Sequence, residues 1–198
     1  MTRSIQVVAL LLLCAFGALP AAAAEDKPWA IDQVVGKAEA PVTVIEYSSL
    51  TCPHCAHFHV DIYPKIKSEL IDSGKVKLIF RDFPLDPLAQ AAAMVAHCSG
   101  PRYFNFINAF FHAQDQWAHA AAPEAAIKTI AKLGGMSPEQ VDKCFEDRGL
   151  LNEINARKEA GAQKYNIDST PSFIIGGKLF SGAMTFEEFS KQVAAQSK

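Results

Sequence analysis

Basic residues are sparse and scattered along this chain of 198 residues, in which 19 Lys and Arg face 21 Asp and Glu for a formal net charge of −2. No basic cluster or arginine stripe is present, so the sequence indicates no surface for the phosphates of a nucleic acid. Internal repeats are absent, and low-complexity sequence is confined to the N-terminal segment. The length suits one domain with a sizeable core and room for an insertion.

Long apolar runs are limited to Ile5–Leu19, which is shorter than the roughly 20 residues that a membrane span needs. Arg3 precedes this run, and Ala22–Ala24 gives the small-residue pattern of a signal-peptidase site just before Glu25. We therefore expect residues 1–24 to be a signal peptide and the mature protein to be exported. A transmembrane anchor is the alternative that the short run disfavours.

Cysteine is scarce, with five residues, and Cys14 falls within the predicted signal peptide. The four that remain are an even set, as expected in an oxidising compartment where disulfides persist: Cys52, Cys55, Cys98 and Cys144. A bridge between Cys98 and Cys144 would close a loop of roughly 47 residues and contribute about 4 kcal/mol in the chain-entropy model. We expect this structural disulfide; two reduced core cysteines are the alternative.

The other two cysteines form the motif Cys52-Pro53-His54-Cys55. A CxxC pair at a helix N-terminus can close into a small disulfide ring and reopen by thiolate exchange. The free N–H groups of the helix, together with a donor or charge from His54, predict a lowered pKa for Cys52. Cys55 lies one turn further in and is expected to stay protonated until it acts, so the motif predicts redox chemistry.

A metal site built from Cys52, Cys55, His57 and His59 is a second possibility that the spacing argues against. On one helix the two histidines point about 200° apart, so the four groups cannot converge on one ion. No second CxxC is present to complete a zinc knuckle. We expect no metal and no other cofactor, and we predict that His57 and His59 lie at the surface or are partly packed.

A βαβ unit surrounds the motif. Val42–Tyr47 is a β-branched run typical of a buried strand, and Val76–Phe80 reads as a second one. The helix expected between them, over 55–70, contains Pro64 as a kink. Strand, helix and strand in this order predict that the two strands are parallel.

A helical block follows the unit, because every segment from Leu88 to about Tyr165 has helical character. It is too long and apolar for a loop, and aromatic residues at helical spacing are expected to supply its core: Phe104, Phe110, Phe111 and Trp117, with Ile107. After it, Ser172–Ile175, a Gly-Gly turn and Lys178–Phe180 predict a β-hairpin, and a closing helix starts at about Thr185.

This order of elements is that of the thioredoxin fold, an α/β fold, with an inserted helical domain. The chain resembles the DsbA-type periplasmic thiol:disulfide oxidoreductases of the thioredoxin superfamily over nearly all of its mature length. The match is carried by Glu46-Tyr47, the CPHC motif at 52–55, Phe80–Leu85 and Thr170–Phe173. The domain organisation that follows is a short N-terminal segment at 25–40, a thioredoxin-like domain at 41–83 and 149–198, and a helical insertion at 84–148.

The resemblance implies a role for each site residue. Cys52 would exchange disulfides and Cys55 would resolve them, while Pro53, His54 and Glu46 tune the site, with Glu46 serving proton transfer at the buried cysteine. Thr170 and Pro171 resemble the cis-proline loop that binds substrate peptide. The expected activity is donation of the Cys52–Cys55 disulfide to folding exported proteins in the periplasm by a monomer, with reoxidation by a quinone-linked membrane protein of the DsbB type.

Other functions fit the same motif. An isomerase or reductase uses the same thiolate chemistry, and Thr before the cis-proline also occurs in isomerase-like relatives. Dimeric isomerases add an N-terminal assembly domain, for which 25–40 is too short, so the sequence favours a monomeric oxidase. From a different class, a periplasmic metallochaperone would use the thiols as ligands, and a peptide-binding chaperone would use the insert without turnover.

Overall fold

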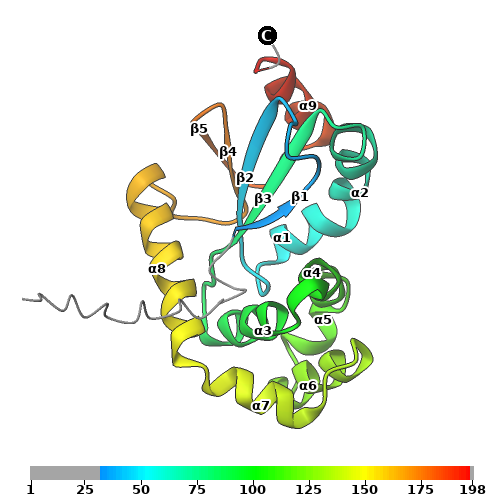
Figure 1. The fold of residues 1–198 in the computed structure, drawn as a ribbon, viewed down its shortest axis with the longest axis vertical. Helices are drawn as coiled ribbons and strands as arrows, with labels where there is room; N and C mark the ends of the chain where they lie inside the picture. The colour runs from blue at the N-terminus through cyan, green and yellow to red at the C-terminus, as the bar shows by residue number, and fades with distance from the viewer. Residues whose placement is uncertain (1–31, 197–198) are drawn as a thin grey trace, which may run out of the picture.

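The computed structural model describes residues 32–196. The predicted signal peptide at 1–24, its cleavage site and Cys14 lie outside the described residues. Within 32–196, no helix is both long and apolar enough to cross a membrane. Figure 1 shows a sheet with helices on both faces and a group of further helices below it.

The sheet has five strands in the order β1-β3-β2-β4-β5. Their bounds are β1 Gln33–Val35, β2 Val42–Ser48, β3 Val76–Asp82, β4 Ser172–Ile175 and β5 Lys178–Ser181. β2 and β3 are parallel, which confirms the βαβ prediction, and the other neighbours pair antiparallel. The sequence analysis did not predict β1, because three residues are too few to show an alternating pattern.

One face of the sheet is covered by the helical stretch that follows the CxxC motif and by the last helix. The stretch consists of α1 Pro53–His57, η2 Phe58–Ile62, α2 Tyr63–Ile66 and η3 Lys67–Ile71, of which η2 and η3 are π-helical. Pro64 has no N–H to donate back to the preceding turn, and the wide π turn before it accommodates this loss. The predicted kink is therefore a change of helix type.

The last helix, α9 Phe186–Ala194, begins at a capping box in which the Thr185 hydroxyl accepts from the Glu188 N–H. Its Phe189 ring lies 5.9 Å from that of Phe173 on β4, and Phe173 lies 4.8 Å from Phe58. These three buried rings join the helices to the sheet.

The opposite face is covered by α8 Arg148–Tyr165, which rises from the helical group to run beside the sheet (Figure 1). Gly161 is buried in this contact, where an added Cβ would lie 2.4 Å from the Tyr47 ring. The absence of a side chain at Gly161 thus lets the helix approach β2.

The helical group lies between β3 and β4 in the sequence. Before α8 it contains α3 Pro87–Cys98, η4 Gly100–Arg102, α4 Tyr103–His112, α5 Gln114–Trp117, α6 Pro123–Leu133 and α7 Pro138–Glu146. The expectation of helix up to Tyr165 is confirmed. The predicted aromatic core is buried except for Phe104, which is partly buried against it.

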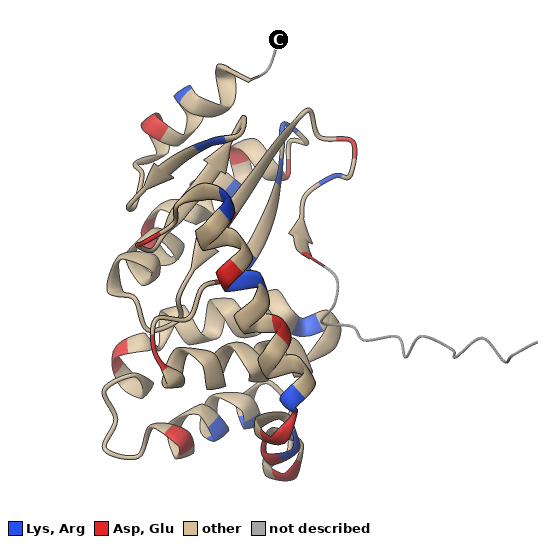
Figure 2. Ribbon diagram, turned by 90° about the vertical axis from the view of Figure 1, so that its left-hand side faces the viewer, with Lys and Arg blue, Asp and Glu red and all other residues tan. Residues whose placement is uncertain are grey.

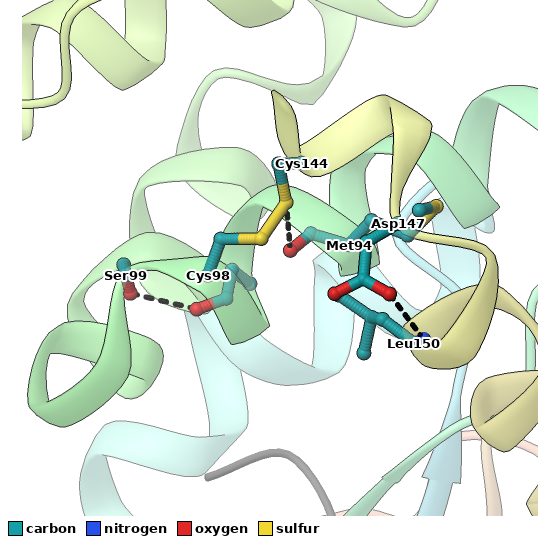
Figure 3. The surroundings of a disulfide bond; sticks show 7 residues. Met94, Cys98, Ser99, Cys144, Asp147 and Leu150 are labelled. Atoms are coloured by element: carbon teal, nitrogen blue, oxygen red, sulfur yellow. Dashed lines mark hydrogen bonds between the residues drawn. A yellow bond between two sulfur atoms is a disulfide. The ribbon is translucent and has the colours of Figure 1, made fainter. Parts of the chain in front are cut away.

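Cys98 at the end of α3 and Cys144 on α7 form a disulfide across 46 positions of sequence. Figure 3 shows the bond beside Met94, with Asp147 capping the start of α8 through the Leu150 N–H. The bridge therefore fastens two helices of the insert. Figure 2 shows acidic and basic residues interspersed over the helices.

Candidate active site

The CxxC motif lies where β2 leads into the first helix. Cys52 is the N-cap of α1 with extended backbone angles, and Pro53 occupies the first helical turn. Proline suits this place because its fixed φ fits the helix and no N–H partner is lost there. The Ala56 N–H donates to the Cys52 carbonyl at 3.1 Å, so the motif forms the first turn of the helix.

The two thiols, both free, have opposite environments. The Cys55 thiol, then the Thr170 side chain and the backbone N–H groups of Cys55 and His54, lower the pKa of Cys52 to about 5, against the opposing effect of burial. Burial, and next the hydrogen bond with Cys52, raise the pKa of Cys55 well above its usual range. Cys52 is 6% exposed and Cys55 0%, so the cysteine with the lowered pKa is also the less buried of the two.

His54 contributes to this site through its backbone N–H. Its side chain is exposed, and no hydrogen bond or ion pair of the imidazole is present among residues 32–196. The sequence analysis expected the imidazole itself to tune Cys52, and that role remains a prediction.

Thr170 and Pro171 lie against Cys52, and the peptide bond between them is cis. The Cys52 thiol donates to the Thr170 carbonyl at 3.3 Å. The Thr170 hydroxyl is buried close enough to Cys52 to lower its pKa, although it makes no hydrogen bond in this arrangement. The structure thus brings together residues from two distant parts of the chain.

Glu46 lies on β2 and is hydrogen-bonded to His59 on η2, with 2.8 Å between Oε1 and Nε2. Both side chains are buried, at 0% and 3% exposure. The His59 ring also stacks on Phe111 of the insert at 4.3 Å. The expectation that His59 is a surface or partly packed residue is therefore wrong, whereas His57 is exposed and pairs with Asp61.

The burial of His59 has a physical cause that the sequence contained. A lone carboxylate on an apolar strand is costly to bury without a partner. His59 supplies that partner. The lone Glu46 was the available signal, but the sequence does not say which nearby polar residue turns inward.

Sequence reasoning missed Gln114 altogether. Its Nε2 donates to the Leu50 carbonyl at 2.7 Å and to the Cys52 carbonyl at 3.0 Å. Nearby, the Thr51 hydroxyl donates to Asp86 at 2.5 Å, and Asp86 caps α3. The active-site turn is thus held from the insert and from the β3–α3 connection.

No group of three or more His, Cys, Asp and Glu side chains that could hold a metal ion is present among the described residues. The geometry is instead that of a dithiol pair in which the pKa of Cys52 is lowered and the pKa of Cys55 is raised. A thioredoxin sheet with such a pair at the N-terminus of α1, next to a cis-proline loop, defines the class of thiol:disulfide exchange proteins.

The chain belongs to the thioredoxin family, whose family model, described as Thioredoxin, matches residues 30–195. Within that family it is DsbA-like. The crystal structure of alpha-DsbA1 from Wolbachia pipientis is 32% identical, with a TM-score of 0.78 over 83% of this chain and 90% of that one. A helical insert in the thioredoxin fold is thus shown for this chain.

Two curated relatives carry corresponding names. A Rickettsia typhi protein named as a protein-disulfide oxidoreductase is 33% identical over 148 residues, which are 74% of this chain and 55% of that protein. Disulfide bond formation protein D of Bacillus subtilis is 26% identical over 83% of this chain and 77% of its own length. The chain thus spans about half the length of the Rickettsia relative.

Proposed function

We propose that this protein oxidises pairs of thiols in exported proteins by giving them the Cys52–Cys55 disulfide. The observation that carries this proposal is the asymmetry of the two sulfurs, with the Cys52 pKa near 5 and that of Cys55 raised. Stabilising one thiolate favours the reduced form of the pair. A pair that prefers to be reduced is an oxidant of other thiols.

The size of this bias follows from the lowered pKa. At pH 7 an unperturbed thiol is protonated, so lowering its pKa as far as 7 has little effect at this pH. Only the further lowering of the Cys52 pKa, from 7 to about 5, stabilises the thiolate at pH 7. That part corresponds to about 2–3 kcal/mol in favour of the reduced form, or about 50 mV. The bias is full above the unfolded pKa and fades as the pH falls through the folded one.

The exchange runs in two steps. A client thiolate attacks Cys52 Sγ, the Cys52–Cys55 bond breaks, and Cys55 leaves with the electron pair and takes up a proton. A second client thiolate then attacks the client sulfur of the mixed disulfide, and Cys52 leaves as a thiolate. The client gains a disulfide and the protein holds two reduced sulfurs, so the electrons balance.

Thr170 and Pro171 are proposed to bind the client. The Thr170 carbonyl accepts the Cys52 S–H only while Cys52 is a thiol. Once Cys52 is ionised or joined to a client, that carbonyl is free for a client N–H. Pro53 and His54 are proposed to shape the motif, Glu46 to exchange the Cys55 proton, and the Cys98–Cys144 bridge to be structural.

The setting is proposed to be the periplasm, with residues 1–24 as a cleaved signal peptide and the protein acting as a monomer. Each turnover leaves the pair reduced, so the cycle needs an electron acceptor. A quinone-linked membrane protein of the DsbB type is proposed for that step, and no bound cofactor is required in this chain.

Trapping experiments test the proposal. Cys55→Ala keeps the exchanging sulfur and removes the resolving one. When this variant is incubated with an oxidised two-cysteine peptide, the Cys52 thiolate attacks the peptide disulfide and one peptide sulfur leaves as a thiolate, so a mixed disulfide should accumulate on Cys52, as seen by mass spectrometry. Cys52→Ala should accumulate none. Cys98→Ala/Cys144→Ala is the matched control and should oxidise a reduced two-cysteine peptide at the parent rate. Trapping of the peptide on Cys55 in Cys52→Ala would overturn the proposal.

An isomerase is the second candidate, because a protein-disulfide isomerase of Novosphingobium aromaticivorans is a structural match at 25% identity and a TM-score of 0.72. Incubating the reduced protein with a client whose disulfides are scrambled separates the two functions. Efficient correction would favour the isomerase. Fast oxidation of a reduced client with poor correction supports the oxidase.

A further inference from the structure

Gln114 is a polar side chain of the insert that the described chemistry does not use. It lies on α5, one turn long, and is buried at 5% exposure. Its amide nitrogen donates to two backbone carbonyls of the turn that leads into the CxxC motif, Leu50 at 2.7 Å and Cys52 at 3.0 Å. These are contacts between residues more than 60 positions apart in sequence.

The position of these two carbonyls matters for the reacting sulfur. The Cys52 carbonyl also accepts from the Ala56 N–H at 3.1 Å, so Gln114 adds a second donor to the residue that caps the helix. The Leu50 residue is 2% exposed, and Gln114 is the donor that the structure shows for its carbonyl. Together the two bonds fix the chain on both sides of Thr51.

We propose that Gln114 is a positioning residue through which the helical insert holds the active-site turn, so that the Cys52 sulfur stays aligned with the N–H groups of α1. The inference rests on the proposed exchange at Cys52 and adds a residue to it. Gln114 touches no reacting atom. It acts through the backbone of Cys52, and it explains one way in which the insert contributes to the chemistry.

Gln114→Met tests the proposal, since methionine has a similar size and no donor. Gln116 on the same short helix is exposed, so Gln116→Met is the matched control. The thiolate absorbance of the reduced protein is followed against pH. Because Gln114→Met loses both hydrogen bonds to the turn, we expect the Cys52 pKa to rise by about one unit in this variant and to stay unchanged in the control.

The oxidation equilibrium with glutathione supplies a readout that lost packing alone would not move. A rise of the Cys52 pKa from about 5 to about 6 weakens the preference of the pair for the reduced form close to tenfold at pH 7. At pH 4, where Cys52 is protonated in both proteins, the two equilibria should agree. A parent-like pKa in Gln114→Met, or an equal change at both pH values, would overturn the positioning role.

Two further measurements keep the proposal open to refutation if Gln114→Met folds poorly. Gln114→Glu keeps the shape and replaces the donor with an acceptor facing two carbonyls, so a larger rise of the Cys52 pKa is expected. In the parent protein, the side-chain amide NMR signals of Gln114 should shift with the titration of Cys52. Signals that ignore that titration would contradict the proposal. If client trapping on Cys52 fails while the Cys52 pKa rises in Gln114→Met as expected, the proposed function is refuted and the positioning role of Gln114 stands.

Discussion

At the scale of single residues, the buried pair of Glu46 and His59 is the feature with the largest expected effect on stability. Removing one member leaves the other buried without its hydrogen-bond partner, and an unsatisfied buried polar group costs about 1–3 kcal/mol, or more where it is charged. We expect Glu46→Leu and His59→Phe each to lower the free energy of unfolding by this amount. The side chains are 0% and 3% exposed, so water cannot replace the lost bond.

The double variant Glu46→Leu/His59→Phe should lose less than the sum of the two single variants, because no unpaired polar group remains. Urea unfolding of the four proteins measures this difference. Additive losses would show that the two side chains do not stabilise one another. His57→Phe is the control, because His57 is exposed and its replacement should change the free energy of unfolding little.

The residues that the sequence analysis missed share a physical reason. Residue type and spacing in the sequence are enough to identify the CxxC motif, the Thr170-Pro171 step and the other cysteines. Gln114 and His59 acquire their places only when the insert packs against the thioredoxin unit, since one reaches the Cys52 carbonyl and the other stacks on Phe111. No local pattern records a contact that the tertiary fold creates.

At the scale of elements, the order of strands and helices was predictable because buried strands and apolar helices carry strong periodic patterns. β2, β3 and the hairpin of β4 and β5 were predicted to within one or two residues. β1 and the π turns were not. β1 is too short to show a pattern, and the π turns depend on how the preceding turn accommodates Pro64.

The packing of α8 on the sheet makes Gly161 an element-scale test. Alanine is favoured over glycine in a helix by about 1 kcal/mol. Here an added Cβ would lie 2.4 Å from the Tyr47 ring, so we expect Gly161→Ala to destabilise by about 1–3 kcal/mol in spite of the helix propensity. Tyr47→Leu in the same chain should recover part of the loss, whereas a more stable Gly161→Ala would show that α8 shifts freely.

The disulfide between α3 and α7 is the second element-scale test. Its loop of 46 positions predicts a loss of about 4 kcal/mol on replacing both cysteines by alanine, if the chain-entropy model holds. Urea unfolding of Cys98→Ala/Cys144→Ala measures the loss. The Cys52 pKa should not change, because the bridge lies outside the contacts that lower it. A shifted Cys52 pKa would mean that the bridge also acts on the exchange site.

At the scale of the whole molecule, the redox state of one pair should set how the stability of the protein depends on pH. The Cys52 pKa is lowered to about 5 on folding, so the reduced protein gains stability that is full above the unfolded pKa near 9 and is lost as the pH falls through about 5. The oxidised protein has no thiol in this pair and gains none. All other titrating groups are common to both forms.

The difference between the two forms isolates this one linkage. We expect the free energy of unfolding of the reduced protein, minus that of the oxidised protein, to rise by about 2–3 kcal/mol between pH 4 and pH 7. Cys55 adds nothing over this range, because its raised pKa keeps it protonated whether folded or unfolded. Urea unfolding of both forms at the two pH values gives the difference directly. A difference that does not change with pH would show that the folded protein does not stabilise the Cys52 thiolate, and the oxidising bias would then need another source.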